Sequence, residues 1–237
     1  MSPRVADPNV RSALVETAAR LLAEQEGLTI RRLAQEVGTS TMAVYTHFGG
    51  MEDLRRAVRL EGFARLAAHL DAVARSRDPV ADLSALGWAY CFNALANPNL
   101  YRVMFLEAPI DAEEAESGGA TFAPVVTAVQ RCIDAGRFMS CDAWSLAVQT
   151  WTMVHGMVGV VLAGVFGPDE MLGHLSAMTI SLYVGNGDSR DAAVRSIGRA
   201  RRRMEPHAPI KRSDGAAEFE RPNIENAAPQ QTASRLG

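Results

Sequence analysis

The chain has 237 residues, of which 48% are hydrophobic and 22% charged, so it can bury a sizeable core and lacks the composition of a disordered chain. Its net charge of -3 does not by itself favour a nucleic-acid partner. Three cysteines (Cys91, Cys132 and Cys141) form no CxxC pair and leave an odd number, which favours a reducing compartment over a disulfide framework. The first ten residues lack the apolar segment of a signal peptide, so we expect a cytoplasmic protein.

Apolar residues recur at helical spacing and strand signals are scarce, so we predict an all-α fold. Four helices are expected in the first part of the chain, at 9–27, 28–37, 39–48 and 52–75. Asn9 and Thr29 are the expected N-caps of the first two, and the third is expected to begin near Ser40 or Thr41. Gly38 is expected to end the second helix.

The composition changes after a linker at residues 76–79. Residues 1–60 hold 8 basic and 7 acidic side chains, whereas residues 81–180 hold 3 basic and 10 acidic ones. This change predicts a second domain. Its expected helices are 79–96, 99–106, 121–135, a long uncharged helix capped by Ser140, 169–184 and 188–203, with an acidic loop at 107–119. Residues 204–237 show little periodicity and are expected to be disordered.

Residues 143–166 contain no Asp, Glu, Lys or Arg and are long enough to cross a bilayer. The same stretch carries five polar residues, however: Ser145, Gln149, Thr150, Thr152 and His155. A helix buried between other helices or between subunits explains this mixture better, so we predict no membrane partner.

The most informative segment is LTIRRLAQEVGTSTMAVYTHFGGMEDL, residues 28–54. It contains two short amphipathic helices joined by a turn at 37–40. The residues expected to form their shared core are Leu33, Ala34, Val37, Val44 and Phe48. Thr41, Met42, Tyr45 and Thr46 then lie on the outer face of the second of these helices, which is the layout of a DNA-binding helix-turn-helix.

With its preceding apolar helix, this segment resembles the DNA-binding domain of the TetR (tetracycline-repressor-like) family over about residues 9–60. The resemblance implies that Thr41, Met42 and Tyr45 read bases, with Met42 limited to apolar contacts such as a thymine methyl. It implies phosphate contacts for Thr29, Thr46 and His47, and either a phosphate or a guanine-edge contact for Arg31. The expected DNA-binding residues are therefore Thr29, Arg31, Ser40, Thr41, Met42, Tyr45, Thr46 and His47. Tyr45 and His47 have capping or packing as an alternative role, and only one of the adjacent Arg31 and Arg32 can point at DNA.

The chain departs from the family pattern at Met51, where a lysine is common. Either Arg55 or Arg56 supplies the missing charge, or affinity for the DNA backbone is weaker and its salt dependence shallower.

Residues 151–156 (WTMVHG) resemble the Trp-x-x-x-His-Gly signature of one class of TetR C-terminal domains, and the resemblance spans about residues 81–185. It implies a domain that dimerises and binds a small effector. Small residues at Gly156, Gly159, Ala163 and Gly164 let another helix approach, either in a dimer seam with helix 169–184 or inside one subunit.

An effector pocket is expected to be apolar with a few polar groups. The candidates are Trp88, Phe92, Met104, Phe105, Phe122, Val126, Trp151 and His155. Ordinary core packing is the alternative for each apolar residue. For His155 the preferred alternative is a structural hydrogen bond to a carbonyl inside the bundle.

An enzyme is not expected, because GxSxG, HExxH and phosphate-binding glycine motifs are missing from the sequence. His69, His155 and His174 lack partners at ligand spacing, so we predict neither a metal nor a cofactor.

The expected organisation is a DNA-binding domain at 1–50, a linking helix at 51–77, a ligand-binding and dimerisation domain at 78–203 and a tail at 204–237. The predicted function is a homodimeric repressor on a palindromic operator, released when a mostly apolar effector shifts the linking helix. A regulator without an effector, constitutive or redox-responsive, is the alternative. The basic run at 199–203 is a solvated helix end or an additional DNA contact.

Overall fold

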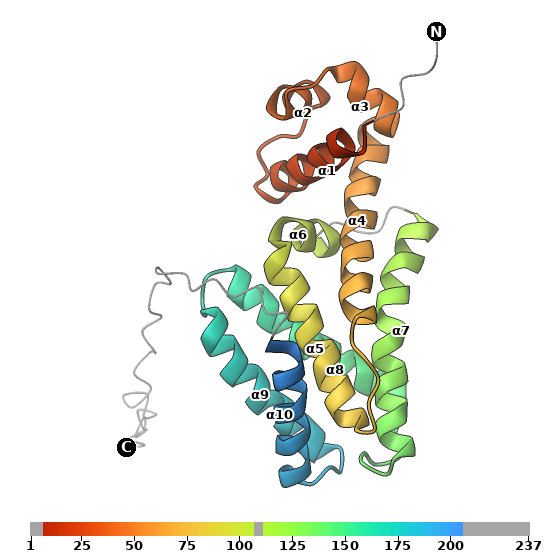
Figure 1. Ribbon diagram of the computed structural model, residues 1–237, viewed down its shortest axis with the longest axis vertical. Coiled ribbons are helices and arrows are strands. Elements are labelled where there is room, and N and C mark those ends of the chain that lie inside the picture. The colour runs from red at the N-terminus through yellow and green to blue at the C-terminus, as the bar shows by residue number, and fades with distance from the viewer. Residues whose placement is uncertain (1–6, 107–110, 206–237) are drawn as a thin grey trace, which may run out of the picture.

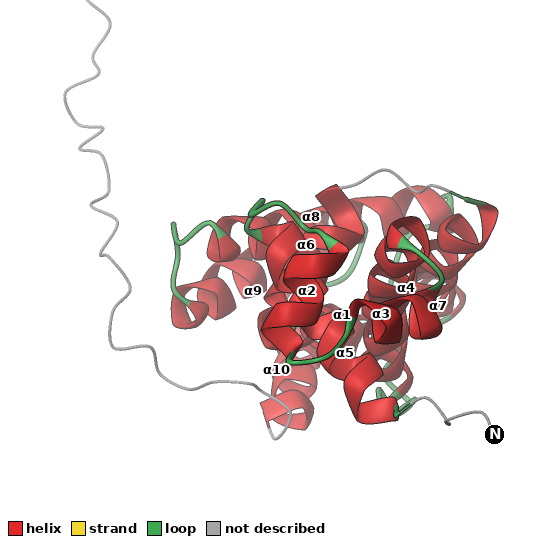
Figure 2. Ribbon diagram, turned by 90° about the horizontal axis from the view of Figure 1, so that it is seen from above, coloured by secondary structure: helices red, strands yellow, loops and turns green. Residues whose placement is uncertain are grey.

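The computed structural model describes residues 7–106 and 111–205, which form ten helices and, within those ranges, no strand (Figures 1 and 2). The prediction of an all-α fold is confirmed. Figure 1 shows α1, α2 and α3 gathered at one end and α4 running from them alongside α7. The helices are α1 (Pro8–Ala23), α2 (Ile30–Val37), α3 (Thr41–Phe48), α4 (Met51–Asp71), α5 (Pro79–Ala96), α6 (Pro98–Leu106), α7 (Ala112–Asp134), α8 (Ala143–Leu162), α9 (Pro168–Gly185) and α10 (Arg190–Met204).

Short-range hydrogen bonds set the limits of α2 and α3. The Thr29 hydroxyl accepts from the Arg32 amide at 3.1 Å and the Ser40 hydroxyl from the Ala43 amide at 3.1 Å. Gly38 ends α2 with φ at 71°, a left-handed conformation that glycine adopts without a steric penalty. The cap expected at Thr29, the break expected at Gly38 and the start expected near Ser40 are confirmed.

Two predicted caps are wrong. Asp7 rather than Asn9 caps α1, and its carboxylate accepts from the Asn9 amide at 2.9 Å. Asp142 rather than Ser140 caps α8, accepting from the amides of Trp144 and Ser145. In the first case the helix begins with Pro8, a residue favoured at the first helical position because it has no amide hydrogen to satisfy.

The acidic loop predicted at 107–119 is also wrong for residues 112–119, which form the first turns of α7. Asp111 and Glu114 make a capping box, in which each side chain accepts from the other residue's amide. The glycines at 118 and 119 therefore lie inside a helix that is held at its start. Residues 107–110 and the tail beyond residue 205 lie outside the described residues, and α10 continues to Met204.

The described residues pack into two hydrophobic cores. The smaller core holds α1, α2, α3 and the first half of α4, and it also includes Leu100 and Val103 of α6. The larger core holds the second half of α4 together with Tyr101 and Met104 of α6, α5, and α7 to α10. Both α4 and α6 therefore contribute to each core.

A buried ion pair fastens α4 to the start of α7. The Arg59 guanidinium lies 2.8 Å from the Glu114 carboxylate, and each side chain is only 1% exposed. One turn earlier on α4, Arg56 pairs with Asp111 at 2.8 Å and also with Glu113. These contacts tie α4, which extends from the smaller core, to a helix of the larger core.

The basic run at the end of α10 makes contacts inside the larger domain. Arg199 pairs with Asp78, and Arg203 lies 2.9 Å from Asp82 at the start of α5. Figure 1 places α10 in the half of the molecule away from α2 and α3. This position favours internal pairing for these two arginines over additional DNA contact.

Among the described helices, α8 alone has the length and hydropathy to cross a membrane. It packs against α5, α7 and α9, and Leu146, Val154 and Val158 are buried on its inner side. Core helices of this kind meet the same length and hydropathy criteria, and the packing agrees with the expected helix between helices.

The Arg59–Glu114 pair predicts a large stability effect. Arg59→Met should lower the free energy of unfolding by about 3–5 kcal/mol, because it leaves a buried carboxylate without its guanidinium. Glu113→Gln, which removes a carboxylate that is 61% exposed, should cost under about 1 kcal/mol. Urea unfolding followed by circular dichroism measures both, and equal losses would contradict this account of the pair.

Candidate DNA-binding surface and effector cavity

The helix-turn-helix is held by side chains between α2 and α3. Leu33, Ala34, Val44 and Phe48 are buried in the smaller core, and Val37 packs against it partly buried. The five residues that the sequence assigned to this core are therefore brought together. Their packing leaves the opposite side of α3 free of intramolecular contacts with the core.

The outer face of α3 is unusually apolar for an exposed surface. The Met42 side chain is 70% exposed and that of Tyr45 is 49% exposed, and Thr41 and Thr46 are exposed beside them. The Thr46 hydroxyl donates to the Met42 carbonyl at 2.9 Å, so it must rotate away before it can donate to a phosphate. Exposed planar and methyl-bearing side chains on one short helix suit contacts with base edges.

The caps of α2 and α3 present groups that suit phosphate. Thr29 and Ser40 are exposed, and each hydroxyl oxygen accepts from its own helix, which leaves the hydroxyl proton available to a phosphate. The amides of the first helical turn point the same way and carry partial positive charge. His47 is half-buried with its ring 6.0 Å from that of Phe48.

The structure distinguishes the two adjacent arginines. Arg32 pairs with Glu26 and, at 2.9 Å, with Glu36. Arg31 is exposed and forms no ion pair with any described residue. Arg31 is therefore the one of the two that is available to DNA.

The missing lysine at Met51 is not replaced by Arg56, because Arg56 is paired with Asp111 and Glu113 on α7. Arg55, the other sequence candidate, also has an interaction within the described part of the chain, so it is not free either. Within the DNA-binding end, Arg20 is also paired with Glu24 at 2.8 Å and with Glu36. Few arginines in this part of the chain therefore lack an intramolecular ion pair and can contact DNA phosphates.

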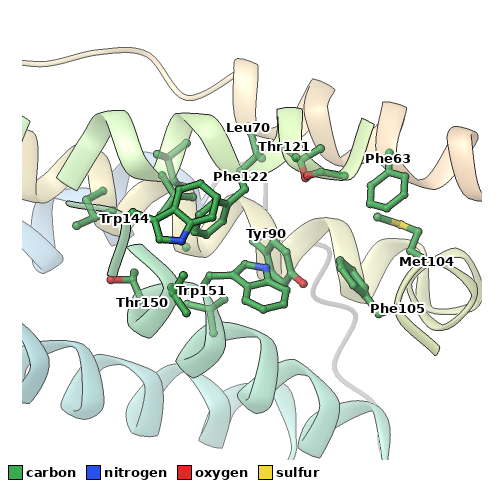
Figure 3. A pocket seen from close by; sticks show the side chains of 18 residues that line it. Phe63, Leu70, Tyr90, Met104, Phe105, Thr121, Phe122, Trp144, Thr150 and Trp151 are labelled. Atoms are coloured by element: carbon green, nitrogen blue, oxygen red, sulfur yellow. The ribbon is translucent and has the colours of Figure 1, made fainter. Parts of the chain in front are cut away.

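A cavity of about 550 Å³ lies between α4, α5, α7 and α8, with α6 at one end (Figure 3). This volume is within the range of small-molecule sites. The exposed Trp144 lies at the rim, with its ring 4.9 Å from that of Phe122. The described lining residues are Phe63, Leu70, Leu83, Leu86, Gly87, Tyr90, Met104, Phe105, Gly118, Gly119, Thr121, Phe122, Val125, Trp144, Val148, Thr150, Trp151 and Val154.

Four of the eight sequence candidates line this cavity: Met104, Phe105, Phe122 and Trp151. The other four (Trp88, Phe92, Val126 and His155) do not. Trp88 and Phe92 are buried on another face of α5, with their rings 6.4 Å apart. The cavity face of α5 is Leu83, Leu86, Gly87 and Tyr90, a helical spacing of three, four and seven that points to one side. Following that spacing, rather than choosing the largest apolar residues, would have found Tyr90.

His155 lies behind the lining in a hydrogen-bonded group. Its Nδ1 atom is 2.8 Å from the Tyr90 hydroxyl and 2.7 Å from the Tyr101 hydroxyl, and its ring stacks on Trp151. Burial lowers the pKa of His155, which favours the neutral imidazole. The partners are thus two phenol hydroxyls, in place of the carbonyl that the sequence interpretation expected.

The two faces of α6 connect the cavity to the DNA-binding core. Leu100 and Val103 are buried in the smaller core, whereas Tyr101 and Met104 are buried in the larger one. Met104 also touches α4 where Gly62 gives it room, since a Cβ atom at Gly62 would lie 2.5 Å from the Met104 sulfur. A group that displaces Met104 or Phe105 would therefore press on a helix shared with the DNA-binding domain.

A helix-turn-helix joined through shared helices to a helical domain with an apolar cavity is the architecture of a bacterial transcriptional regulator. Two family models match the chain: bacterial regulatory proteins of the tetR family over residues 14–58, and a tetracyclin repressor-like C-terminal domain over residues 83–181. The chain belongs to the TetR family and is a DNA-binding transcriptional regulator rather than an enzyme. Neither match bears on the Trp-x-x-x-His-Gly class, which stays a prediction.

Known proteins extend this likeness over most of the chain. The uncharacterized HTH-type transcriptional regulator Rv0681 of Mycobacterium tuberculosis is 29% identical over 181 residues, covering 74% of this chain and 80% of that protein. The HTH-type transcriptional repressor AcnR of Corynebacterium glutamicum is 43% identical over 61 residues, 25% of this chain and 32% of AcnR. A solved structure of a protein of unknown function from Rhodococcus sp. RHA1 superposes with a TM-score of 0.65 at 27% identity, covering 79% of this chain and all of that one.

The different surroundings of Arg31 and Arg32 predict different effects on DNA binding. Arg31→Ala should weaken binding and reduce the slope of log affinity against log salt by about 1 per subunit, because one phosphate contact is lost. Arg32→Ala should leave that slope unchanged, since its guanidinium is held by Glu26 and Glu36. Fluorescence anisotropy on a DNA site selected from random sequence measures both slopes. An unchanged slope in Arg31→Ala would contradict the assignment.

Proposed function

We propose that this protein is a homodimeric repressor that binds a palindromic operator and is released from it by a small, mostly apolar effector held in the cavity. The observation that carries the proposal is the apolar cavity whose wall includes α6, a helix that is also part of the DNA-binding core. The name of AcnR, a repressor that this chain resembles in its DNA-binding part, supports repression. A DNA target implies a cytoplasmic location.

Operator recognition is assigned to α3 and to the ends of α2 and α3. Thr41, Met42 and Tyr45 contact base edges, whereas Thr29, Arg31, Ser40, Thr46 and His47 contact the backbone. In a dimer the two α3 helices enter successive major grooves about 34–36 Å apart, and the two-fold axis of the protein makes the operator palindromic. Met42 in this arrangement favours a thymine methyl.

The dimer interface is assigned to the outer face of α8 and α9. Exposed residues on this face of α8 are small or uncharged: Ser145, Gln149, Thr152, Gly156 and Gly159. On α9 the neighbouring exposed residues include Gly173, Ala177 and Met178. From Met171 to Gly185, α9 has no Asp, Glu, Lys or Arg. Such a face is suited to close helix packing against its own copy.

The effector acts by favouring a separation of the two α3 helices that does not fit the operator. It lowers DNA affinity only as far as it binds the two arrangements differently. The sequence assigned transmission to the helix after the DNA-binding domain, which is α4. The shared packing of Leu100 and Val103 adds α6 to that route.

The alternative is a regulator without an effector, either constitutive or redox-responsive. A preformed apolar cavity of about 550 Å³ favours the effector. Burial raises the pKa of the Cys91 thiol and of the Cys132 thiol to about 12, so neither is a thiolate at neutral pH. Redox control through these two buried cysteines is correspondingly disfavoured.

The decisive experiment is fluorescence anisotropy on the DNA upstream of the protein's own gene, with unrelated DNA as competitor and a site selected from random DNA as a second probe. Tyr45→Ala should lower specific affinity about tenfold or more and leave competitor binding unchanged, because it removes a base contact. Val194→Ala, a change at another exposed apolar residue on α10, is the matched control. Failure to select any DNA sequence would contradict the proposal of a sequence-specific regulator. Full affinity in Tyr45→Ala would contradict the assignment of base contacts to α3.

The dimer interface is tested by Gly159→Arg. A Cβ atom at Gly159 has no other atom within 4 Å, so the subunit itself accommodates a side chain there, and the arginine should interfere only with a second copy. Sedimentation should show conversion of dimer to monomer, together with weaker operator binding. Ala68→Arg on the exposed face of α4 is the control and should stay dimeric. A dimeric Gly159→Arg protein would place the interface elsewhere.

A further inference from the structure

The cavity offers hydrogen bonds but no charge. None of its 18 described lining residues is Asp, Glu, Lys, Arg or His. A charged ligand would lose its hydration there without gaining an ion pair from those residues, at a cost of several kcal/mol. The polar residues in its lining are Tyr90, Thr121, Thr150 and the two indoles of Trp144 and Trp151, and Tyr90 is labelled at the centre of Figure 3.

The Tyr90 hydroxyl shares a single nitrogen with a second hydroxyl. Tyr90 and Tyr101 both approach His155 Nδ1, at 2.8 Å and 2.7 Å. In a neutral imidazole this atom has either one lone pair or one N–H, so it forms one strong hydrogen bond in the ring plane. It cannot accept a proton from both phenols, and if it donates, both phenol protons need other acceptors.

The two phenol hydroxyls differ in the hydrogen-bond acceptors available to them besides His155 Nδ1. Besides Nδ1, the Tyr101 hydroxyl has the His155 carbonyl, at 3.4 Å. Besides Nδ1, the Tyr90 hydroxyl has the Tyr101 oxygen as an acceptor at 3.5 Å, which is a weak contact. The Trp151 indole also hydrogen-bonds Tyr90, but an indole N–H only donates and cannot accept the phenol proton. Tyr90 is itself a lining residue of the cavity. Burial raises the pKa of the Tyr90 phenol well above its usual value, so it keeps its proton. When His155 Nδ1 accepts a hydrogen bond from Tyr101, the protonated Tyr90 hydroxyl is therefore left without a good acceptor.

We propose that the cavity selects a neutral ligand carrying a hydrogen-bond acceptor, that the Tyr90 hydroxyl donates to this acceptor, and that His155 Nδ1 then serves Tyr101 alone. Tyr101 belongs to α6, so a ligand that engages Tyr90 strengthens the contact between α6 and α8. The inference rests on the proposed effector function and adds the ligand's chemical class and the residue that recognises it. A ketone, ester or amide on an apolar, ring-bearing skeleton has the required features.

Binding of three fluorescent or absorbing probes tests the ligand class. Prodan is a neutral naphthyl ketone, N-phenylnaphthylamine is a neutral arylamine without a carbonyl, and naphthoate is the carboxylate counterpart. Prodan should bind the full chain with a fluorescence increase, and naphthoate should bind at least tenfold more weakly. Absence of prodan binding, or naphthoate binding as tight as that of prodan, would overturn the proposal.

Tyr90→Phe tests the donor. It should weaken prodan about fivefold, the effect of one neutral hydrogen bond, and leave N-phenylnaphthylamine unchanged. Tyr183→Phe is the matched control, because it removes another buried phenol hydroxyl that does not line this cavity. Equal weakening of both dyes in Tyr90→Phe would indicate a change in cavity shape and would overturn direct donation, as would unchanged prodan affinity.

The role of His155 is tested by ¹⁵N spectra of histidine-labelled protein, with the His155 signals assigned from a His155→Gln sample. Prodan should shift the Nδ1 resonance in the wild-type chain and in Tyr183→Phe but not in Tyr90→Phe. A wild-type resonance that prodan leaves unchanged would overturn the exchange between the two phenols.

The same preparations are assayed for operator binding without dye, which separates the two proposals. Operator binding without prodan binding would contradict this inference but would not affect the proposed function in DNA binding. A chain that binds prodan through Tyr90 but selects no DNA contradicts the proposed function and leaves the ligand class intact.

Discussion

The packing of Leu100 and Val103 against the helix-turn-helix, while Tyr101 and Met104 of the same helix are buried in the larger core, couples the two halves of this molecule. A nine-residue helix cannot keep both sets of contacts if one core moves relative to the other. The DNA-binding end is therefore not joined to the rest of the subunit through a flexible linker alone. Its position is set by the helices that also enclose the cavity.

Ion pairs strengthen the same connection and affect the way the protein meets DNA. Arg56 and Arg59 join α4 to the first turns of α7, and Arg20 and Arg32 hold α1 and α2 to nearby carboxylates. These arginines are occupied within the subunit. In the proposed function, backbone affinity depends more on hydroxyls and amides at helix ends, and on Arg31, than on a broad basic surface. This is how a chain with a net charge of -3 can contain a DNA-binding domain.

The cavity combines a mostly apolar wall with a small polar group placed behind it. Because His155 stacks on Trp151 and contacts both Tyr90 and Tyr101, a change at the lining reaches α6 through atoms already within hydrogen-bonding distance. Bulky aromatic residues define much of the cavity wall. In the proposed function, this arrangement links recognition of an uncharged ligand in one core to a helix shared with the other core.

Features that depend on neighbours along the chain could be predicted from the sequence. Thr29, Gly38 and Ser40 delimit α2 and α3 through contacts within a few residues, and the exposed residues proposed to contact base edges lie within the single short helix α3. The all-α fold follows from the same local periodicity.

Which helix faces pack against each other depends on the three-dimensional arrangement and could not be predicted from local patterns. The choice between Arg31 and Arg32 depended on the ion pairs of Arg32 with Glu26 and Glu36. The start of α7 depended on a capping box between acidic residues, whose composition had suggested a loop. Tyr90, Tyr101 and His155 come from three helices and are separated by up to 65 residues, so no local pattern announces their contact. A local pattern marks one side of a helix as apolar, but whether that side encloses a cavity or fills a core is decided by the helices packed against it.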